Sequence, residues 1–310
     1  MILFWCLIFF VALSALIWAS NLFTEMAAKI GLLFHVPPFI IGVTVVALGT
    51  SLPELISSII AVYRDSSEIV AGNVLGSNIT NIFLILGIIA LLEKNVKMKY
   101  DIGSVDMPFL IGGTFLYAMF IFDKKYTFFE AVLSLIVIAL YLIYSVSGHV
   151  TSHNANSNGT GKKEKLTPWL YLLLSGFIVY LGANFTIEAI LKISDHFHLG
   201  KSVIAASAVA LGTSLPELVV SISAVRQGHS ELAIGNILGS NIFNMFAVMS
   251  IPSFLGPLFI ETEMVIIILP ILIVATLMFY FITNEKQMTK WEGALLLVFY
   301  LFFLTQLFSF

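Results

Sequence analysis

Apolar residues dominate this chain in long runs that are separated by short polar segments. Ten of these runs are long enough to cross a bilayer, which takes about 20 mostly apolar residues per helix. They cover residues 1–28, 38–63, 69–92, 104–122, 127–146, 167–193, 201–226, 232–255, 263–283 and 291–309. The pattern therefore predicts an all-α integral membrane protein with ten transmembrane helices.

Composition agrees with this prediction and narrows the possible partners. Of the 310 residues, 59% are hydrophobic and 11% are charged, whereas soluble domains carry roughly 25% charged residues. The net charge of -3 is too small to indicate a nucleic-acid partner. The single cysteine, Cys6, offers neither a disulfide nor a thiolate metal site. We expect the lipid bilayer and inorganic cations as partners, with no cofactor, and the sequence indicates no protein partner.

The loop charges predict an orientation. With ten helices the two termini share one side, and the loops on the other side hold ten of the 15 Lys and Arg residues. Loops rich in Lys and Arg face the cytoplasm. We therefore expect a multi-pass protein of the cell membrane with both termini outside the cytoplasm.

The chain repeats itself at a constant offset of 163 residues. LGTSLPEL at 48–55 recurs unchanged at 211–218, and GNVLGSNITN at 72–81 recurs as GNILGSNIFN at 235–244. The repeat predicts one five-helix unit over 1–146, a flexible cytoplasmic linker over 147–166, and a second unit over 167–310. Because five is odd, the second unit enters the membrane inverted, as in many secondary transporters, whose substrate sites lie near the midplane between the repeats.

The motif around Pro53 predicts a break in the second helix. Proline has no N–H for the carbonyl of Gly49, and its ring crowds that oxygen. The helix then consists of two halves. Carbonyl groups without hydrogen-bond partners and the partial negative charge at the end of the first half lie beside Glu54. The seventh helix is expected to break in the same way before Glu217. Hydroxyls, carboxylates and carbonyls suit hard cations such as Ca2+ and Na+. This donor set comprises Thr50, Ser51 and Glu54 with Thr213, Ser214 and Glu217.

Ser51-x-x-Glu54 also fits a capping box, which is a common structural device. A charge at mid-membrane costs at least ~2.5–3.5 kcal/mol even on the lenient insertion scale, and a cap could use Gln instead. Two glutamates in equivalent positions therefore favour a functional role over capping.

The second motif combines packing residues with polar ones. Gly72 and Gly76 have the spacing that allows helices to approach closely. The asparagines at 73 and 78 fit interhelical hydrogen bonding and ion binding equally well. Deeper along the helices we expect site residues at Ser77, Asn81, Ser240 and Asn244. By contrast, Asp106 falls at a predicted helix end, where a solvated carboxylate is the ordinary expectation.

The doubled GTSLPE and GNxxGSN motifs resemble the repeats of the calcium/cation antiporter superfamily, and most of all short prokaryotic sodium/calcium exchangers. The resemblance covers nearly the whole chain. It implies a core of helices 2, 3, 7 and 8, across which helices 1 and 6 slide to alternate access. It also implies that Ca2+ is bound by Glu54, Glu217, Thr50 and Thr213.

The resemblance implies two flanking Na+ sites. One comprises Ala47, Thr50, Ser51, Ser77 and Glu217, and the other comprises Ala210, Thr213, Ser214, Ser240 and Glu54. Asn81 and Asn244 fall at positions that frame the centre, where many relatives carry one aspartate. The site then holds two formal charges, so the family's stoichiometry does not transfer. The proton/calcium branch carries an acidic residue after its GN signature, which this chain lacks, so Na+ is favoured as counter-ion.

Two buried carboxylates also give a physical reason for exchange. An unpaired charge of -2 is costly to enclose in a medium of low dielectric constant, so only cation-loaded forms should switch sides. Close carboxylates should also let protons compete with Ca2+. The sequence thus predicts a Ca2+/Na+ antiporter. The alternatives are an H+/Ca2+ (or other divalent-cation) exchanger and, less favoured, a cation channel. No enzyme motif is present.

Overall fold

The computed structural model describes residues 2–63, 67–93, 95–97, 100–150, 162–196 and 212–307, and these are almost entirely helical. The first half contains α1 (Ile2–Phe34), α2 (Pro38–Ile41), the π-helical η1 (Gly42–Val46), α3 (Ala47–Thr50), α4 (Leu52–Tyr63), α5 (Glu68–Thr80), η2 (Asn81–Leu86), α6 (Gly87–Leu92), β1 (Asn95–Lys97), α7 (Asp106–Ile121), β2 (Lys125–Tyr126) and α8 (Phe128–Val150).

The second half has a matching order of elements. It contains α9 (Lys162–His196), α11 (Leu215–Arg226), α12 (Ser230–Phe243), η3 (Asn244–Val248), α13 (Ser250–Ser253), β3 (Leu258–Phe259), η4 (Met264–Ile268), α14 (Leu269–Asn284), β4 (Gln287–Thr289) and α15 (Lys290–Leu307). α8 and α9 both extend into the segment that the sequence predicted as a linker.

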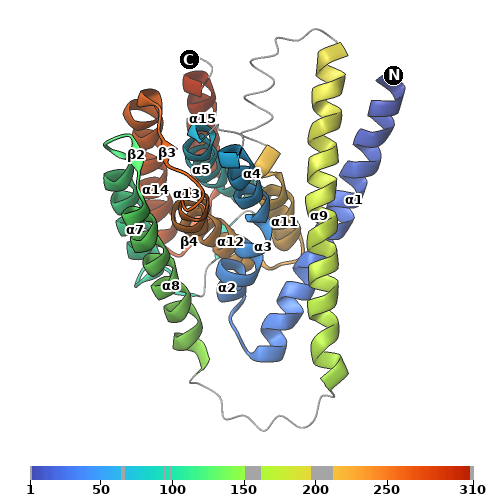
Figure 1. Cartoon of the computed structure of the whole chain (residues 1–310). Coiled ribbons are helices and arrows are strands. Elements are labelled where there is room, and N and C mark those ends of the chain that lie inside the picture. Colours follow the sequence, from blue (N-terminus) through green and yellow to red (C-terminus); the bar gives the residue numbers. More distant parts are fainter. Residues whose placement is uncertain are drawn as a thin grey trace.

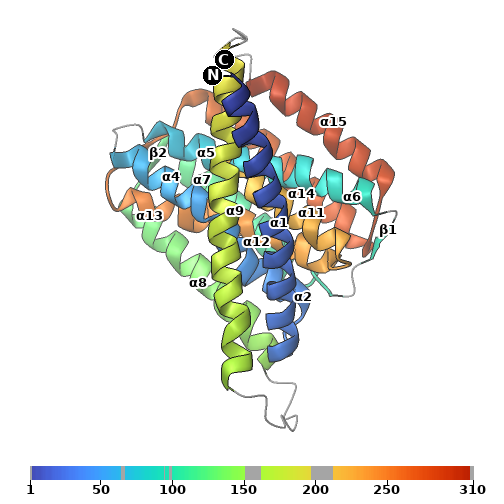
Figure 2. The same ribbon diagram turned by 90° about the vertical axis from the view of Figure 1, so that its right-hand side faces the viewer.

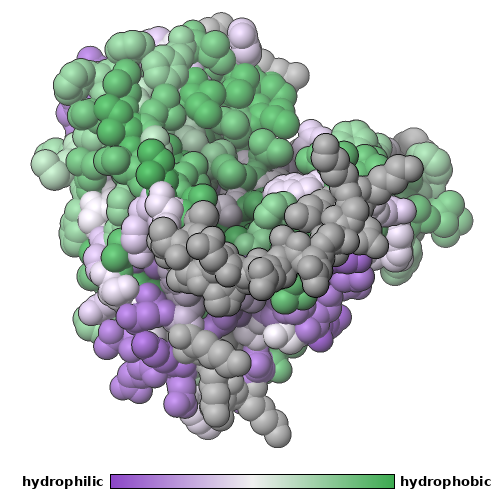
Figure 3. Space-filling model, turned by 90° about the horizontal axis from the view of Figure 1, so that it is seen from below, coloured by the Kyte–Doolittle hydropathy of each residue, from purple (hydrophilic) through white to green (hydrophobic). Residues whose placement is uncertain are grey.

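Eight helical segments of the described chain are long and apolar enough to cross a membrane. They are Leu3–Phe34, Pro38–Tyr63, Glu68–Leu92, Phe128–Ser147, Leu166–Thr186, Ser230–Ser253, Met264–Asn284 and Lys290–Leu307. A shorter apolar helix, Asp106–Ile121, occupies the range predicted at 104–122. The run predicted at 201–226 lies partly outside the described residues. The chain is therefore a multi-pass membrane protein, and on the face seen in Figure 3 its hydrophobic and hydrophilic residues occupy separate areas.

The two segments that carry the GN motif form the centre of the molecule. In Ser230–Ser253, 94% of the most apolar stretch is buried, compared with 22% in Leu3–Phe34. α1 and α9 lie side by side at the edge of the bundle (Figures 1 and 2). They approach closely because Gly182 lies against the backbone of Leu16, where a Cβ would come within 3.1 Å.

The end of α1 shows how local chemistry sets a boundary. The helix continues to Phe34, past the predicted end at residue 28. His35 then adopts a left-handed conformation (φ 57°), and the N–H of Val36 bonds to the carbonyl of Gly31. Pro37 and Pro38 follow, and proline cannot continue a helix. Gly31 and Lys29 therefore lie inside the helix, and the positive φ at His35 ends it.

Two short antiparallel pairs of strands connect the halves, and the sequence pattern did not predict them. β1 pairs with β4 through Asn95 with Thr289 and Lys97 with Gln287, and β2 pairs with β3 through Lys125 with Phe259. Each pair joins one strand from each half. The loops that contain β1 and β4 therefore lie on the same side of the bundle, as do those that contain β2 and β3.

Asp106 corrects one expectation from the sequence. Its side chain is fully buried at the start of α7 and accepts a hydrogen bond of 2.9 Å from the hydroxyl of Tyr141. The expected solvated position is wrong, because α8 packs a tyrosine over the helix end.

Candidate functional site

Glu54 and Glu217 lie in the first turns of α4 and α11, and both side chains are 0% exposed. The hydroxyl of Ser51 donates to Oε1 of Glu217 over 3.1 Å. The other carboxylate oxygens, Glu54 Oε1 and Oε2 and Glu217 Oε2, accept no hydrogen bond among the described residues. Buried carboxylates without donors are costly unless a cation or a proton compensates them.

The backbone before each glutamate leaves helical geometry for one residue. Ser51 has φ -88° and ψ 3°, and Ser214 has φ -84° and ψ 4°. α3 ends at Thr50 and α4 starts at Leu52, with Pro53 in its first turn. The side chain of Ser214 does not cap α11, and Ser51 bonds across to Glu217 instead. The serines are therefore available to the site rather than used as helix caps.

The two threonine hydroxyls of the GTS motifs bond across the boundary between the halves. Thr50 Oγ1 donates to Oδ1 of Asn236 over 3.1 Å, and Thr213 Oγ1 donates to Oδ1 of Asn73 over 3.1 Å. Thr213 Oγ1 also lies 3.2 Å from Oγ of Ser77. Thr213 and Ser77 thus meet across the boundary between the halves, and Thr50 makes the equivalent contact with Asn236.

The asparagines deeper in the bundle form a second set of bonds between the halves. Asn81 Nδ2 donates to Oδ1 of Asn241, and Asn244 Nδ2 donates to Oδ1 of Asn78, each over 3.1 Å. Asn78 Nδ2 donates in turn to the backbone carbonyl of Asn241 over 3.1 Å. The side-chain oxygens of Asn81 and Asn244 keep no hydrogen-bond partner among the described residues.

The unpartnered buried oxygens of the motif residues all belong to side chains that can bind hard cations. They are Glu54 Oε1 and Oε2, Glu217 Oε2, Thr80 Oγ1, Ser214 Oγ, Ser240 Oγ, Asn81 Oδ1 and Asn244 Oδ1. Oxygen ligands of mixed charge are the set that Ca2+ and Na+ prefer. In the described chain no group of three or more His, Cys, Asp or Glu could hold a metal ion, and the carboxylates among these unpartnered groups are those of Glu54 and Glu217.

Of the predicted site residues, Ala47 is buried against α12, while Ala210 lies outside the described residues. Sequence reasoning left Asn73 and Asn78 undecided and did not single out Asn236 and Asn241. All four are buried and accept hydrogen bonds from predicted site residues. The constant offset of 163 was the signal that could have paired them, because each bond has a counterpart in the other half.

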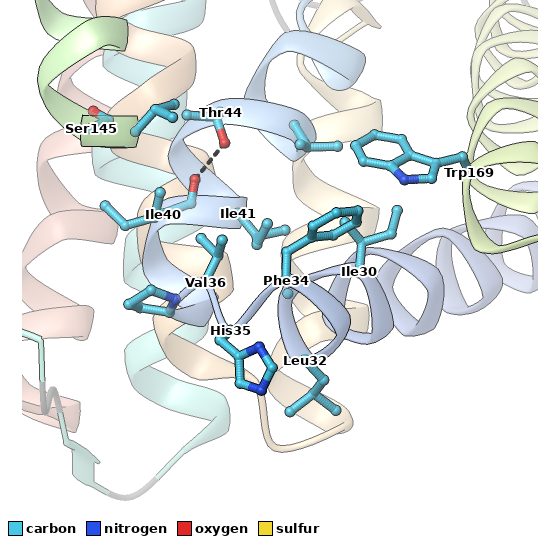
Figure 4. Close-up of a pocket in the computed structure, with 14 residues that line it drawn as sticks. Ile30, Leu32, Phe34, His35, Val36, Ile40, Ile41, Thr44, Ser145 and Trp169 are labelled. Atoms are coloured by element: carbon cyan, nitrogen blue, oxygen red, sulfur yellow. Dashed lines mark hydrogen bonds between the residues drawn. The ribbon is translucent and has the colours of Figure 1, made fainter. Parts of the chain in front are cut away.

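A cavity of about 350 Å³ reaches the site from one side. Pro53, Asn73 and Thr213 line it at the site, Ile60 lines it along α4, and Asn184 lines it from α9. The cavity in Figure 4 is separate and holds about 890 Å³. It lies between the end of α1, α2, η1 and Trp169, and its lining includes neither glutamate.

Another part of the site is packed by an aromatic ring from α1. A Cβ at Gly49 would lie 3.1 Å from the Phe23 ring, and a Cβ at Gly176 in α9 would lie at the same distance. Phe23 is 4% exposed. Its ring therefore fills the space between α3 and α9 directly before Thr50.

The chain resembles known proteins over most of its length. Residues 4–147 and 167–308 match the family described as sodium/calcium exchanger protein. The sodium/calcium exchanger MaX1 of Methanosarcina acetivorans is 30% identical over 97% of this chain and 98% of its own. The inner membrane protein YrbG of Escherichia coli is 29% identical over 80% of this chain and 78% of its own.

Solved structures give the same result for the fold. The sodium-calcium exchanger NCX_Mj, soaked with 10 mM Na+ and zero Ca2+, superposes with a TM-score of 0.87 at 27% identity. The superposition covers 97% of this chain and 98% of that chain. With nearly the whole chain matched in both sequence and structure, this protein belongs to the sodium/calcium exchanger family.

Proposed function

We propose that the protein is a secondary antiporter that exchanges Ca2+ for Na+ by alternating access. The observation that carries this proposal is the pair of fully buried glutamates amid unpartnered oxygens, with neither carboxylate in an ion pair among the described residues. Enclosed without a cation, the site would keep a charge of -2 in a medium of low dielectric constant. One Ca2+ or two Na+ neutralises that charge, so only loaded forms can switch sides.

We assign the binding of Ca2+ to Glu54, Glu217, Thr50 and Thr213. The flanking Na+ positions comprise Ala47, Ser51 and Ser77 on one side and Ala210, Ser214 and Ser240 on the other, with Asn81 and Asn244 at the centre. The unpartnered oxygens of Glu54, Ser214 and Ser240 support this assignment. The names of MaX1 and NCX_Mj, both sodium/calcium exchangers, support the pair of ions.

The architecture that we propose is a ten-helix bundle of two inverted five-helix repeats, with interrupted helices 2 and 7. The repeats cover 1–146 and 167–310, and the linker 147–166 joins them on the cytoplasmic side. The one-residue departures at Ser51 and Ser214 and the hydrogen bonds related by an offset of 163 support this plan. Both termini then lie outside the cytoplasm.

Alternation of access would come from the pair formed by α1 and α9. The cavity beside Thr213 extends along α4 towards the predicted outer side, while Phe23 packs against Gly49. The described structure thus supports access from the outside. Sliding of α1 and α9 would withdraw Phe23 from Gly49 and close the cavity at Asn184.

The counter-ion can be tested in proteoliposomes. We expect an outward Na+ gradient to drive Ca2+ uptake, because two Na+ carry the charge that the two carboxylates require. Uptake should stop when a Na+ ionophore collapses the gradient, and a pH gradient alone should give none. Uptake driven only by the pH gradient would establish H+ as the counter-ion and contradict the proposed function.

Asn81 and Asn244 are uncharged, and this bears on how much net charge the protein moves across the membrane in each transport cycle. With only two carboxylates, we expect the wild type to exchange two Na+ per Ca2+ without net charge movement. Asn244→Asp adds a third carboxylate close to two others, so one must take up a proton or hold another cation. We therefore expect this variant to make transport more dependent on pH and sensitive to membrane potential.

Reversal potentials in proteoliposomes measure this effect. Asn284→Asp adds the same charge at the exposed last residue of α14 and serves as the matched control. Net charge movement in the wild type that Asn244→Asp leaves unaltered would show that the asparagines do not set the charge count.

A further inference from the structure

Four buried asparagines lie beside the site, and their side-chain oxygens accept hydrogen bonds from site residues. Asn73, Asn78, Asn236 and Asn241 each accept, at Oδ1, a hydrogen bond from a side chain of the other half. The donors are Thr50, Thr213, Asn81 and Asn244. We call the four acceptors the asparagine frame. None of them is among the residues assigned above to the ions.

The orientation of two frame amides follows from backbone carbonyls, which can only accept. Asn78 Nδ2 donates to the carbonyl of Asn241 over 3.1 Å, and Asn73 Nδ2 donates to the carbonyl of Glu54 over 3.3 Å. The NH2 group of each amide must therefore point away from its donor partner, and Oδ1 must point towards it. Asn236 Nδ2 donates to Ser221 Oγ over 3.0 Å, a hydroxyl that can also donate, so this contact does not by itself fix the orientation of the Asn236 amide.

In each frame bond, a residue of the site donates its O–H or N–H group to the frame, so that this group points away from the cation position. A threonine hydroxyl that donates to the frame keeps only lone pairs for other partners. An asparagine whose NH2 group donates to the frame turns its Oδ1 to the opposite side. Accordingly, Asn81 Oδ1 and Asn244 Oδ1 are buried and unpartnered among the described residues.

We propose that the asparagine frame fixes the hydrogen-bond polarity of the cation site, so that Thr50, Thr213, Asn81 and Asn244 present oxygens only. The frame residues are positioning residues and do not touch the ion. Every frame bond crosses between the halves, so each half orients the ligands of the other. This inference rests on the proposed function, since it concerns the same site.

Asn241 gives the sharpest test, because its Nδ2 has no partner among the described residues and, of the bonds described there, Leu removes only the one from Asn81. With that bond lost, the Asn81 amide can rotate and turn its NH2 group towards the cation. We expect Asn241→Leu to weaken apparent Ca2+ affinity at least about tenfold, as is typical for loss of a partner that orients a metal ligand. Thr276→Val removes a buried hydroxyl in α14 and is the matched control for folding.

Asn81→Asp should remove the need for the bond from Asn241. A carboxylate has two oxygens and no N–H group, so it presents an oxygen to the cation in either orientation. In an Asn81→Asp background, we expect Asn241→Leu to weaken apparent Ca2+ affinity less than about threefold. With Asn81 present, the same substitution should weaken it at least about tenfold. A purely structural role would give equal losses in both backgrounds. Asn78→Leu with Asn244→Asp repeats the cycle in the other copy, should Asn241→Leu fail to fold.

The two proposals fail separately in this experiment. Absence of Na+-driven Ca2+ uptake by the wild type would overturn the proposed function. Two results would overturn only the proposal about the asparagine frame, provided that the wild type exchanges Ca2+ for Na+. One is unchanged Ca2+ affinity in both Asn241→Leu and Asn78→Leu, and the other is no rescue by aspartate.

Discussion

Glu54→Gln and Glu217→Gln are each expected to reduce Ca2+ transport by at least about 100-fold, since removing one member of a buried charged set costs about 3–5 kcal/mol. Each change removes half of the charge that compensates Ca2+. Neither should unfold the protein, because a buried neutral amide is less costly than a buried carboxylate without a partner. Ca2+ uptake into proteoliposomes measures the loss.

Thermal unfolding separates this effect from misfolding. Ca2+ should raise the Tm of the wild type but not of either variant, because a ligand stabilises only the state that binds it. Glu285→Gln, at an exposed position after α14, is the matched control. Transport near the wild-type rate in either variant would rule out a site with two carboxylates.

Gly239→Ala is expected to impair both stability and transport. A Cβ at Gly239 would lie 2.3 Å from the carbonyl oxygen of Val43 and 2.7 Å from Cβ of Ala47. These atoms belong to η1 and α3, so the added methyl group must push apart the elements that position Thr50. Overpacking a tight core typically costs about 1–3 kcal/mol. We expect a lower Tm and at least about fivefold slower Ca2+ uptake, since 1.4 kcal/mol corresponds to a factor of ten.

Gly112→Ala tests whether the effect comes from packing. Gly112 is exposed in α7, and a Cβ there would meet nothing within 4 Å among the described residues. The same substitution at this position should leave transport unchanged and can stabilise the helix by about 0.5–1 kcal/mol. Equal effects at Gly112 and Gly239 would show that the approach of η1 to α12 is not critical.

Burial of the two glutamates could be predicted from the sequence, because the motif around each of them is local and duplicated. The Pro53-Glu54 pair indicated buried carboxylates beside an irregular helix, and both glutamates are buried. The sequence predicted less about the partners of Asn73 and Asn78. An amide fits structural and ligand roles equally well until its neighbours are known. The structure supplies those neighbours from the opposite half, about 160 residues away in the chain.

Helix ends and strand pairs were the least predictable features. α1 continues to Phe34, where the left-handed His35 and two prolines end it, although Lys29 resembles a loop residue. Asp106 is buried because Tyr141 of α8 covers it, and only tertiary packing brings the two together. The strands β1 to β4 have two or three residues each, too short for an alternating pattern to be recognised.

The strand pairs also constrain how the protein is made. β1 and β2 emerge during synthesis of the first half, but their partners β4 and β3 are near residues 288 and 259. Until the ribosome has delivered most of the second half, the strand edges of the first half have no partner. The two halves therefore become joined at both surfaces only at the end of biogenesis. A truncated first half would therefore lack the native partners of both β1 and β2.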